Sequence, residues 1–134
     1  MNTPFNKPRK LDLSSIVITP RRIGRERDWA CAYVVSMVAH HEKVRYRQLM
    51  LSRRGRKSVA RARQLAMYFT HVVLGRSLDD VALAFDRDRT TVSYACNVIE
   101  DLRDDRAFED EIAALEARIE SGLTQLMENA DVAF

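Results

Sequence analysis

Apolar side chains recur at helical spacing along most of the chain, and each run marks a predicted helix. From Arg25 to His41 they come in pairs four residues apart, which places them on one stripe of an α-helix: Trp29, Ala30, Tyr33, Val34, Met37 and Val38. A short helix is expected at 46–51. Ser58 is expected to cap a longer helix that ends at Leu74, because Gly75 then supplies the turn residue.

Three further helices are predicted in the second half of the chain. Ser77-Leu78-Asp79-Asp80 is similar to a capping box and opens a short helix that ends at Phe85. The next helix, Arg89–Arg103, has apolar residues at core spacing on one face and polar residues on the other, and Phe108–Met127 is amphipathic as well. The pattern predicts an all-α, multi-helix bundle of about six helices, with Thr90 and Thr91 exposed on a helix.

The length of 134 residues supports one domain with tails rather than two independent cores. Residues 1–24 contain all three prolines and five basic residues, so we expect a flexible basic N-terminal arm. The domain is expected at 25–106, followed by an amphipathic acidic C-terminal helix at 107–134. The apolar stripe of that helix either packs on its own domain or joins two copies into a homodimer through 107–127.

The formal net charge of +3 conceals an unequal distribution. Residues 1–63 hold 16 Lys and Arg against 4 Asp and Glu, whereas residues 64–134 hold 6 against 15, so the two parts carry +12 and −9. Clustered basic residues are what the neutralisation of nucleic-acid phosphates requires. The distribution favours a nucleic-acid partner over the alternative of a solvated, mixed surface. The acidic stretch 100–111 is expected to be a solvated helix junction, with a clamp over the basic loop as the alternative.

Several other functions find no support in the sequence. Cys31 and Cys96 lack the spacing of a metal or redox motif, and no two histidines are four residues apart, so we expect buried thiols and no metal site. None of the four glycines has the spacing of a phosphate-binding P-loop, so no nucleotide or other cofactor is expected. No set of nucleophile, base or paired carboxylates has supporting context, so no enzyme is expected. Without a signal or membrane-spanning segment, we expect a cytoplasmic protein with no membrane partner.

A short helix, a tight polar turn and a longer helix with a polar N-terminal end form a helix-turn-helix pattern at 77–103. Many helical proteins contain that pattern, but the residues on its outward face are of the kind that contacts double-stranded DNA. They combine guanidinium donors, hydroxyls, a carboxylate and methyl groups that suit base edges in the major groove. These candidate base-reading residues are Arg87, Asp88, Arg89, Thr90, Thr91 and Tyr94.

Two separated motifs carry a resemblance to a known family. Residues 58–64, SVARARQ, resemble the family pattern SVARPRQ, and residues 84–92, AFDRDRTTV, resemble its signature AFGGRDHTTV. The stretch 51–104 thus resembles the C-terminal DNA-binding domain (domain IV) of the bacterial replication initiator DnaA, and the similarity extends back through 25–41. The resemblance implies a fold of the TrpR and DnaA domain IV type, here in a stand-alone protein without the initiator's ATPase domain.

The resemblance also implies roles for the candidate residues. In that family the signature reads bases in the major groove, which assigns base reading here to Arg87, Asp88, Thr90 and Thr91. The basic loop before Ser58 would reach phosphates and the adjacent minor groove. The candidate contacts to the DNA backbone or the minor groove are Arg53, Arg54, Arg56, Lys57, Ser58, Arg61, Arg63, Ser77 and Ser93.

Departures from the family pattern bear on specificity. The turn is one residue shorter, and Asp86 stands where the pattern has a glycine. Arg89 replaces the signature histidine, so a preference for guanine is expected at that position; the alternative is that the shorter turn places Arg89 on a phosphate. Gly55 stands where the family has its minor-groove arginine, with Arg54 and Arg56 on either side.

The sequence therefore predicts a sequence-specific double-stranded DNA-binding protein. We expect it to associate with the nucleoid and to regulate transcription or replication at sites related to DnaA boxes. The alternative is a protein-interaction module or adaptor that works through the acidic C-terminal helix.

Overall fold

The computed structural model describes residues 28–51 and 56–133, with side chains described through Asn129. Six α-helices and no strand occur in these ranges: α1 (Trp29–Glu42), α2 (Tyr46–Leu51), α3 (Lys57–Val72), α4 (Leu78–Phe85), α5 (Arg89–Leu102) and α6 (Arg106–Ala133). The predicted all-α, multi-helix fold is confirmed. Three predictions lie outside the described residues: the arm 1–24, the helical start at 25–27, and the contacts of Arg53 and Arg54.

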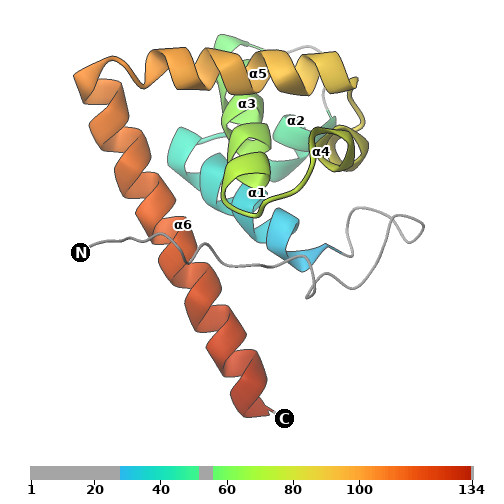
Figure 1. Ribbon diagram of the computed structural model, residues 1–134, viewed down its shortest axis with the longest axis vertical. Helices are drawn as coiled ribbons and strands as arrows, with labels where there is room; N and C mark the ends of the chain where they lie inside the picture. Colours follow the sequence, from blue (N-terminus) through green and yellow to red (C-terminus); the bar gives the residue numbers. More distant parts are fainter. Residues whose placement is uncertain (1–27, 52–55, 134) are drawn as a thin grey trace.

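The helices are arranged around α3, which lies near the centre of the bundle. Figure 1 shows α5 lying across α3, with α4 beside the N-terminal end of α5. From the other end of α5, α6 turns away and runs diagonally past α1, beyond the rest of the bundle. The two ends of α5 are therefore held by different neighbours.

Local hydrogen bonds set the helix ends and explain which predicted boundaries hold. α1 begins at Trp29 because the Asp28 carboxylate accepts from the Cys31 amide at 3.1 Å. The predicted start of α4 is confirmed, since the Ser77 hydroxyl accepts from the Asp80 amide at 3.0 Å. The expected cap at Ser58 is wrong, because α3 already begins at Lys57 and Ser58 lies in its first turn.

α3 forms the centre of the hydrophobic core and is buried on almost every face. Five consecutive residues, Leu65–Phe69, are at most 2% exposed. A helix is apolar all round when neighbours cover each of its sides, and α3 contacts α1, α2, α4 and α5. The sequence pattern had predicted one apolar side. Because α5 packs directly on α3, the central helix fixes where α5 lies.

α6 extends beyond the periodic run 108–127 and covers nearly all of the predicted segment 107–134, and most of its apolar stripe belongs to the core of this same domain. The Asp105 carboxylate accepts from the Phe108 amide at 2.9 Å, so the helix begins at Arg106, and it continues through Gly122 to Ala133. α6 contacts α1, and the middle of its apolar stripe is fully buried, whereas Phe108 is half-buried and Leu126 is 41% exposed. The fully buried residues are Ile112, Leu115, Ile119 and Leu123. Packing on its own domain was the first of the two uses considered. A homodimer through 107–127 stays a prediction.

A charged network joins the end of α5 to α3 and α6. Arg103 donates through Nε and Nη2 to Glu109 at 2.6 and 3.1 Å, and through Nη1 to Glu116 at 3.1 Å. Nη1 also donates to the Tyr68 hydroxyl at 3.1 Å, which itself donates to Glu100 at 2.8 Å. The bond to Glu109 raises the pKa of Arg103 and holds the pKa of Glu109 below its usual range, while burial raises the pKa of Tyr68 to about 12. Such charge-assisted bonds are strong, so the network fixes the junction of α5 and α6.

Gly122, on α6, lies directly against the Tyr33 side chain of α1. A Cβ atom added to Gly122 would overlap the Tyr33 hydroxyl and would lie 2.8 Å from Tyr33 Cζ. A side chain at this position would therefore push α6 away from α1 or displace the Tyr33 ring. The glycine does not end the helix; it leaves room for the Tyr33 side chain of α1 against α6.

Gly122→Ala should lower the free energy of unfolding by up to about 2 kcal/mol, because overpacking costs about 1–3 kcal/mol and the better helix propensity of alanine returns about 1 kcal/mol. In a Tyr33→Ala background the same change should instead stabilise the protein by about 1 kcal/mol, because the obstruction is gone. Urea unfolding of the four variants measures both values.

Ser121→Ala is the matched control, since Ser121 is the exposed neighbour on α6. Ser121→Ala should change the free energy of unfolding by the same small amount in the wild-type and in the Tyr33→Ala background. A stabilising effect of Gly122→Ala in the presence of Tyr33 would contradict the close approach.

Candidate nucleic-acid interface

The turn between α4 and α5 is built around Asp86. Its backbone is left-handed, with φ 55°, and its amide donates to the Leu83 carbonyl at 3.3 Å. The Arg87 amide donates to the Ala82 carbonyl at 2.9 Å, which closes the end of α4. Aspartate is one of the few residues other than glycine that adopts this conformation readily. Asp86 therefore ends α4 where the family signature has a glycine, and α5 begins only three residues later, at Arg89.

The N-terminal part of α5 presents most of the predicted base-reading residues to solvent. Its inward face is buried through Val92, Ala95 and Ile99. The exposed residues are Asp88, Arg89, Thr90, Thr91 and Tyr94, of which Tyr94 is 65% exposed, while Ser93 is half-buried. The prediction of a helix with exposed Thr90 and Thr91 is confirmed. Polar side chains with no role in the core thus gather at one end of one helix.

Arg87 lies at the turn but is folded back on it. Its Nη1 donates to the carbonyls of Phe85 and Asp86, at 3.1 and 3.3 Å, and the side chain is half-buried. These bonds satisfy carbonyls that α4 leaves unpaired at its C-terminal end. In this arrangement Arg87 stabilises the turn, and it would have to swing outward to reach a base.

Arg89 has a partner that sequence reasoning missed. Its Nη1 lies 3.5 Å from the Asp79 Oδ1 in the first turn of α4. In the sequence, Asp79 was interpreted only as part of a capping box, a role that the structure gives to Ser77 and the Asp80 amide. A contact between two helices of the motif has no signature in local spacing.

The N-terminal end of α3 supplies exposed basic residues. Arg56, Lys57 and Ser58 are exposed, and no side chain caps this end of the helix. Arg61, one turn further on, is half-buried and donates to Gln64 at 3.2 Å. A helix N-terminus attracts anions through its open amides and its dipole, and adjacent cations strengthen that attraction.

Arg63 does not lie on that exposed surface. It is 9% exposed, and its guanidinium donates to the Leu49 carbonyl at 2.9 Å and to the Gln48 carbonyl at 3.3 Å. Burial, and then the nearby charge of Arg87, lower the pKa of Arg63. The assignment of Arg63 as a phosphate contact is therefore not supported by its position. It fastens the end of α2 to α3, next to the segment that carries the other basic residues.

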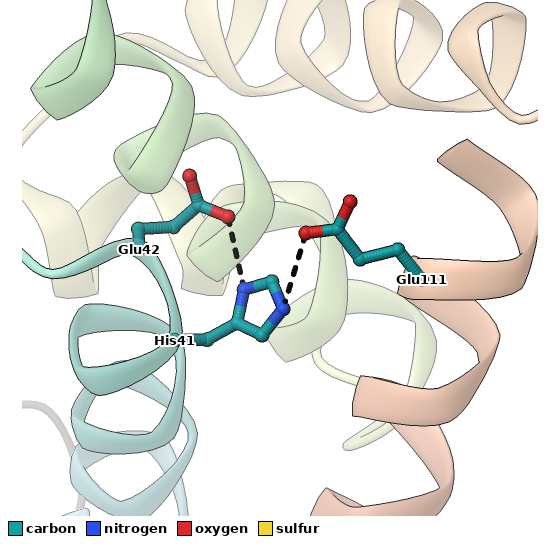
Figure 2. Close-up of side chains that lie close together, drawn as sticks. All are labelled: His41, Glu42 and Glu111. Atoms are coloured by element: carbon teal, nitrogen blue, oxygen red, sulfur yellow. Dashed lines mark hydrogen bonds and ion pairs between the residues drawn. The ribbon is translucent and has the colours of Figure 1, made fainter. Parts of the chain in front are cut away.

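Outside this surface, one group of side chains has the spacing of a metal site. The candidate ligand atoms of His41, Glu42 and Glu111 all lie within 4.8 Å of one another. Figure 2 shows the His41 ring between the two carboxylates, with Nδ1 3.1 Å from Glu42 and Nε2 3.3 Å from Glu111. The two ring nitrogens point in different directions, so one ion could take only one of them together with its carboxylate. We interpret the group as a tie between α1 and α6.

The two cysteines differ in their surroundings. Cys31 is buried, and burial raises its pKa to about 12; the negative charge of Asp28 acts in the same direction. Cys96, on α5, is half-buried rather than buried as predicted, and burial also raises its pKa. Neither thiol carries the lowered pKa of a reactive nucleophile.

Among the described helices, none is long and apolar enough to span a membrane.

The short α4, the turn at Asp86 and the long α5 with its open polar end define a helix-turn-helix DNA-binding domain. Comparison with known families gives the same class and a family: residues 31–99 match the bacterial DnaA protein helix-turn-helix. The chain belongs to this family. The matched region is a DNA-binding domain and not a catalytic one.

Two relatives place the similarity within a larger protein. The chain is 31% identical over 116 residues to the chromosomal replication initiator protein DnaA of Gluconobacter oxydans (strain 621H), covering 85% of this chain and 24% of that protein. A crystal structure of a DNA replication initiation factor aligns with a TM-score of 0.64 and 31% identity, over 73% of this chain and 30% of that one. The chain thus spans about a quarter of the length of the curated relative.

Arg63→Met should lower the free energy of unfolding by about 1.5–3 kcal/mol, because it removes two hydrogen bonds from a charged donor and leaves two carbonyls without them. Lys57→Met, at an exposed position, should stay within about 0.5 kcal/mol of the wild type. Urea unfolding of the two variants measures both changes in the free energy of unfolding. If Arg63→Met kept its stability but weakened DNA binding, Arg63 would be a phosphate contact after all.

Proposed function

We propose that this protein binds double-stranded DNA sequence-specifically, at sites related to DnaA boxes, and that it regulates transcription or replication by occupying them. The observation that carries the proposal is the open N-terminal end of α5, where five predicted base-reading residues are exposed on a helix whose other face is buried. A helix presented in this way fits the major groove, and its first residues reach the base edges. Membership of the DnaA helix-turn-helix family supports the same conclusion.

The proposed roles follow from side-chain chemistry. Arg89 offers a fork of donors to guanine, Asp88 accepts from an exocyclic amine, and the Thr90 and Thr91 methyl groups suit a thymine methyl. Tyr94 and Ser93 lie further along the helix and would contact the rim of the groove. Arg87 would join them only after it releases the carbonyls of the turn.

A second set of residues would contact the phosphate backbone. Arg56, Lys57 and Ser58 lie at the uncapped N-terminus of α3, and Arg61 follows them. We place Ser77, at the exposed cap of α4, in the same set, because the first helix of this motif crosses the backbone. Arg53 and Arg54 would extend the set toward the minor groove. Arg63 is left out of it because its guanidinium is occupied within the chain.

The alternative function, a protein-interaction module acting through α6, has less support. An interaction helix usually presents an apolar face to its partner, but the apolar stripe of α6 is buried against its own domain. The described residues that α6 exposes are mostly small, polar or charged, which suits solvent, and Leu126 is the one large apolar side chain among them. We therefore make no separate proposal for α6.

The test of the proposal is selection of bound duplexes from a random pool by the full chain. A specific protein should enrich a short sequence related to the DnaA box, altered at the position that Arg89 faces. Recovery of a pool with no enriched sequence would show that the protein binds DNA without sequence specificity and would refute the proposal.

Binding should depend strongly on salt. Segment 53–63 holds six basic residues, and with Arg63 buried, five remain to displace counterions, which gives a log–log slope near −4.5. Lys57→Ala should weaken binding to every sequence and flatten the slope by about one unit.

Arg118→Ala on α6 is the control, because it removes an equal charge from an exposed position on another helix. It should leave the slope unchanged. An unchanged slope in Lys57→Ala would show that Lys57 does not contact a phosphate.

Arg89→His should change the preferred base at one position of the site. An arginine–guanine pair discriminates by about 1–3 kcal/mol, whereas an imidazole accommodates a thymine methyl, so guanine should lose its advantage there. The measurement is affinity for duplexes that vary each base of the selected site, at fixed salt. Arg106→His, at the exposed start of α6, should leave the profile intact. A uniform loss of affinity with the same profile would make Arg89 a backbone contact.

A further inference from the structure

The ion pair between Arg89 and Asp79 joins the N-terminal ends of the two helices of the motif. Asp79 lies in the first turn of α4 and Arg89 is the first residue of α5, with Nη1 and Oδ1 3.5 Å apart. Both side chains are open to solvent, at 72% and 62% exposure. The carboxylate thus lies on the same surface as the residue proposed to read a base.

Folding stability gives little reason for this pair. An isolated ion pair between exposed side chains contributes little to folding stability. A negative charge in the first turn does favour the helix dipole of α4, but Asp80 supplies an equivalent charge at the next position. On a surface that approaches phosphates, an extra carboxylate also weakens DNA binding by repulsion. A role in orienting Arg89 accounts for the presence of the Asp79 carboxylate at this position.

We propose that Asp79 is a positioning residue that directs Arg89 to a base edge rather than to a phosphate. This inference rests on the proposed function, in which Arg89 reads a base. A guanidinium has five N–H donors, so a bond from one nitrogen to Asp79 leaves a fork free for the O6 and N7 acceptors of guanine.

The charges of the pair also favour contact of Arg89 with a base edge rather than with a phosphate. A phosphate attracts the free guanidinium but repels the Asp79 carboxylate, so a paired Arg89 gains little from the backbone. The neutral acceptors of a base edge carry no such penalty. Arginine is also long and flexible, and a fixed partner reduces the number of directions that its fork can take.

The experiment measures base profiles and affinity for a non-selected duplex, using the full chain at fixed salt. Asp79→Asn should reduce the discrimination at the Arg89 position at least about threefold, out of the roughly five- to hundredfold that an arginine–guanine pair supplies. It should simultaneously raise the affinity for the non-selected duplex, because a repulsive charge is gone. Asp79→Glu, which keeps a carboxylate within reach, should retain most of the discrimination.

Asp80→Asn is the matched control. It removes the same charge from the neighbouring exposed position, so it should raise affinity for the non-selected duplex and leave the base profile unchanged. In an Arg89→Ala background, Asp79→Asn should have no effect on the profile. Thermal unfolding of each variant checks that the fold is kept.

The possible failures are distinguishable. If the wild type prefers a sequence and Asp79→Asn keeps the full profile, the positioning role is overturned and the proposed function stands. If Asp79→Asn alters the profile equally with and without Arg89, Asp79 acts on its own and the inference is again overturned. If the wild type prefers no sequence, the proposed function and the inference both fail.

Discussion

The structure depends first on the burial of α3. A helix that is covered by neighbours along much of its length can hold several others in fixed positions, and α3, buried from Leu65 to Thr70, does so for α1, α2, α4 and α5. The surface of the DNA-binding motif has no core of its own, because α4 and α5 are short of apolar partners without α3. Large-to-small substitutions at Leu65 or Phe69 would therefore loosen the packing that holds α4 and α5 in place, although both residues are buried in the core.

Arginines serve two separate purposes in this chain. Arg63, Arg76 and Arg103 are turned inward: Arg63 holds the end of α2, Arg103 holds α6, and Arg76 pairs with Asp28 at 3.2 Å and so ties the turn before α4 to the start of α1. Arg56 and Arg89 are turned outward. A count of basic residues therefore overstates the charge that is available to a nucleic acid, and only the contacts of each guanidinium distinguish the two groups.

The helix-turn-helix was predictable because its signals are local. The cap at Ser77, the apolar spacing of α5 and the two family motifs all lie within short stretches, and the structure agrees with each of them. The inward position of Arg63 had a partial signal in the sequence, because its spacing places it on one helical face with the apolar Val59 and Ala66. The pair His41–Glu111 connects helices that are far apart in the sequence, and the pair Arg89–Asp79 depends on how α4 and α5 cross, so no spacing rule could have indicated either of them.

The junction at Arg103 has a further consequence for the thermodynamics of association. It holds one end of α5 while α4 holds the other, so the helix is already formed and oriented before any partner arrives. Segments that fold on binding lose several kcal/mol to the ordering of their backbone, and this one does not. The remaining entropic cost falls on side chains, and most of those at the tip of α5 are short. Association should then be governed by electrostatic steering rather than by a slow conformational step, with a small heat-capacity change for its contact area.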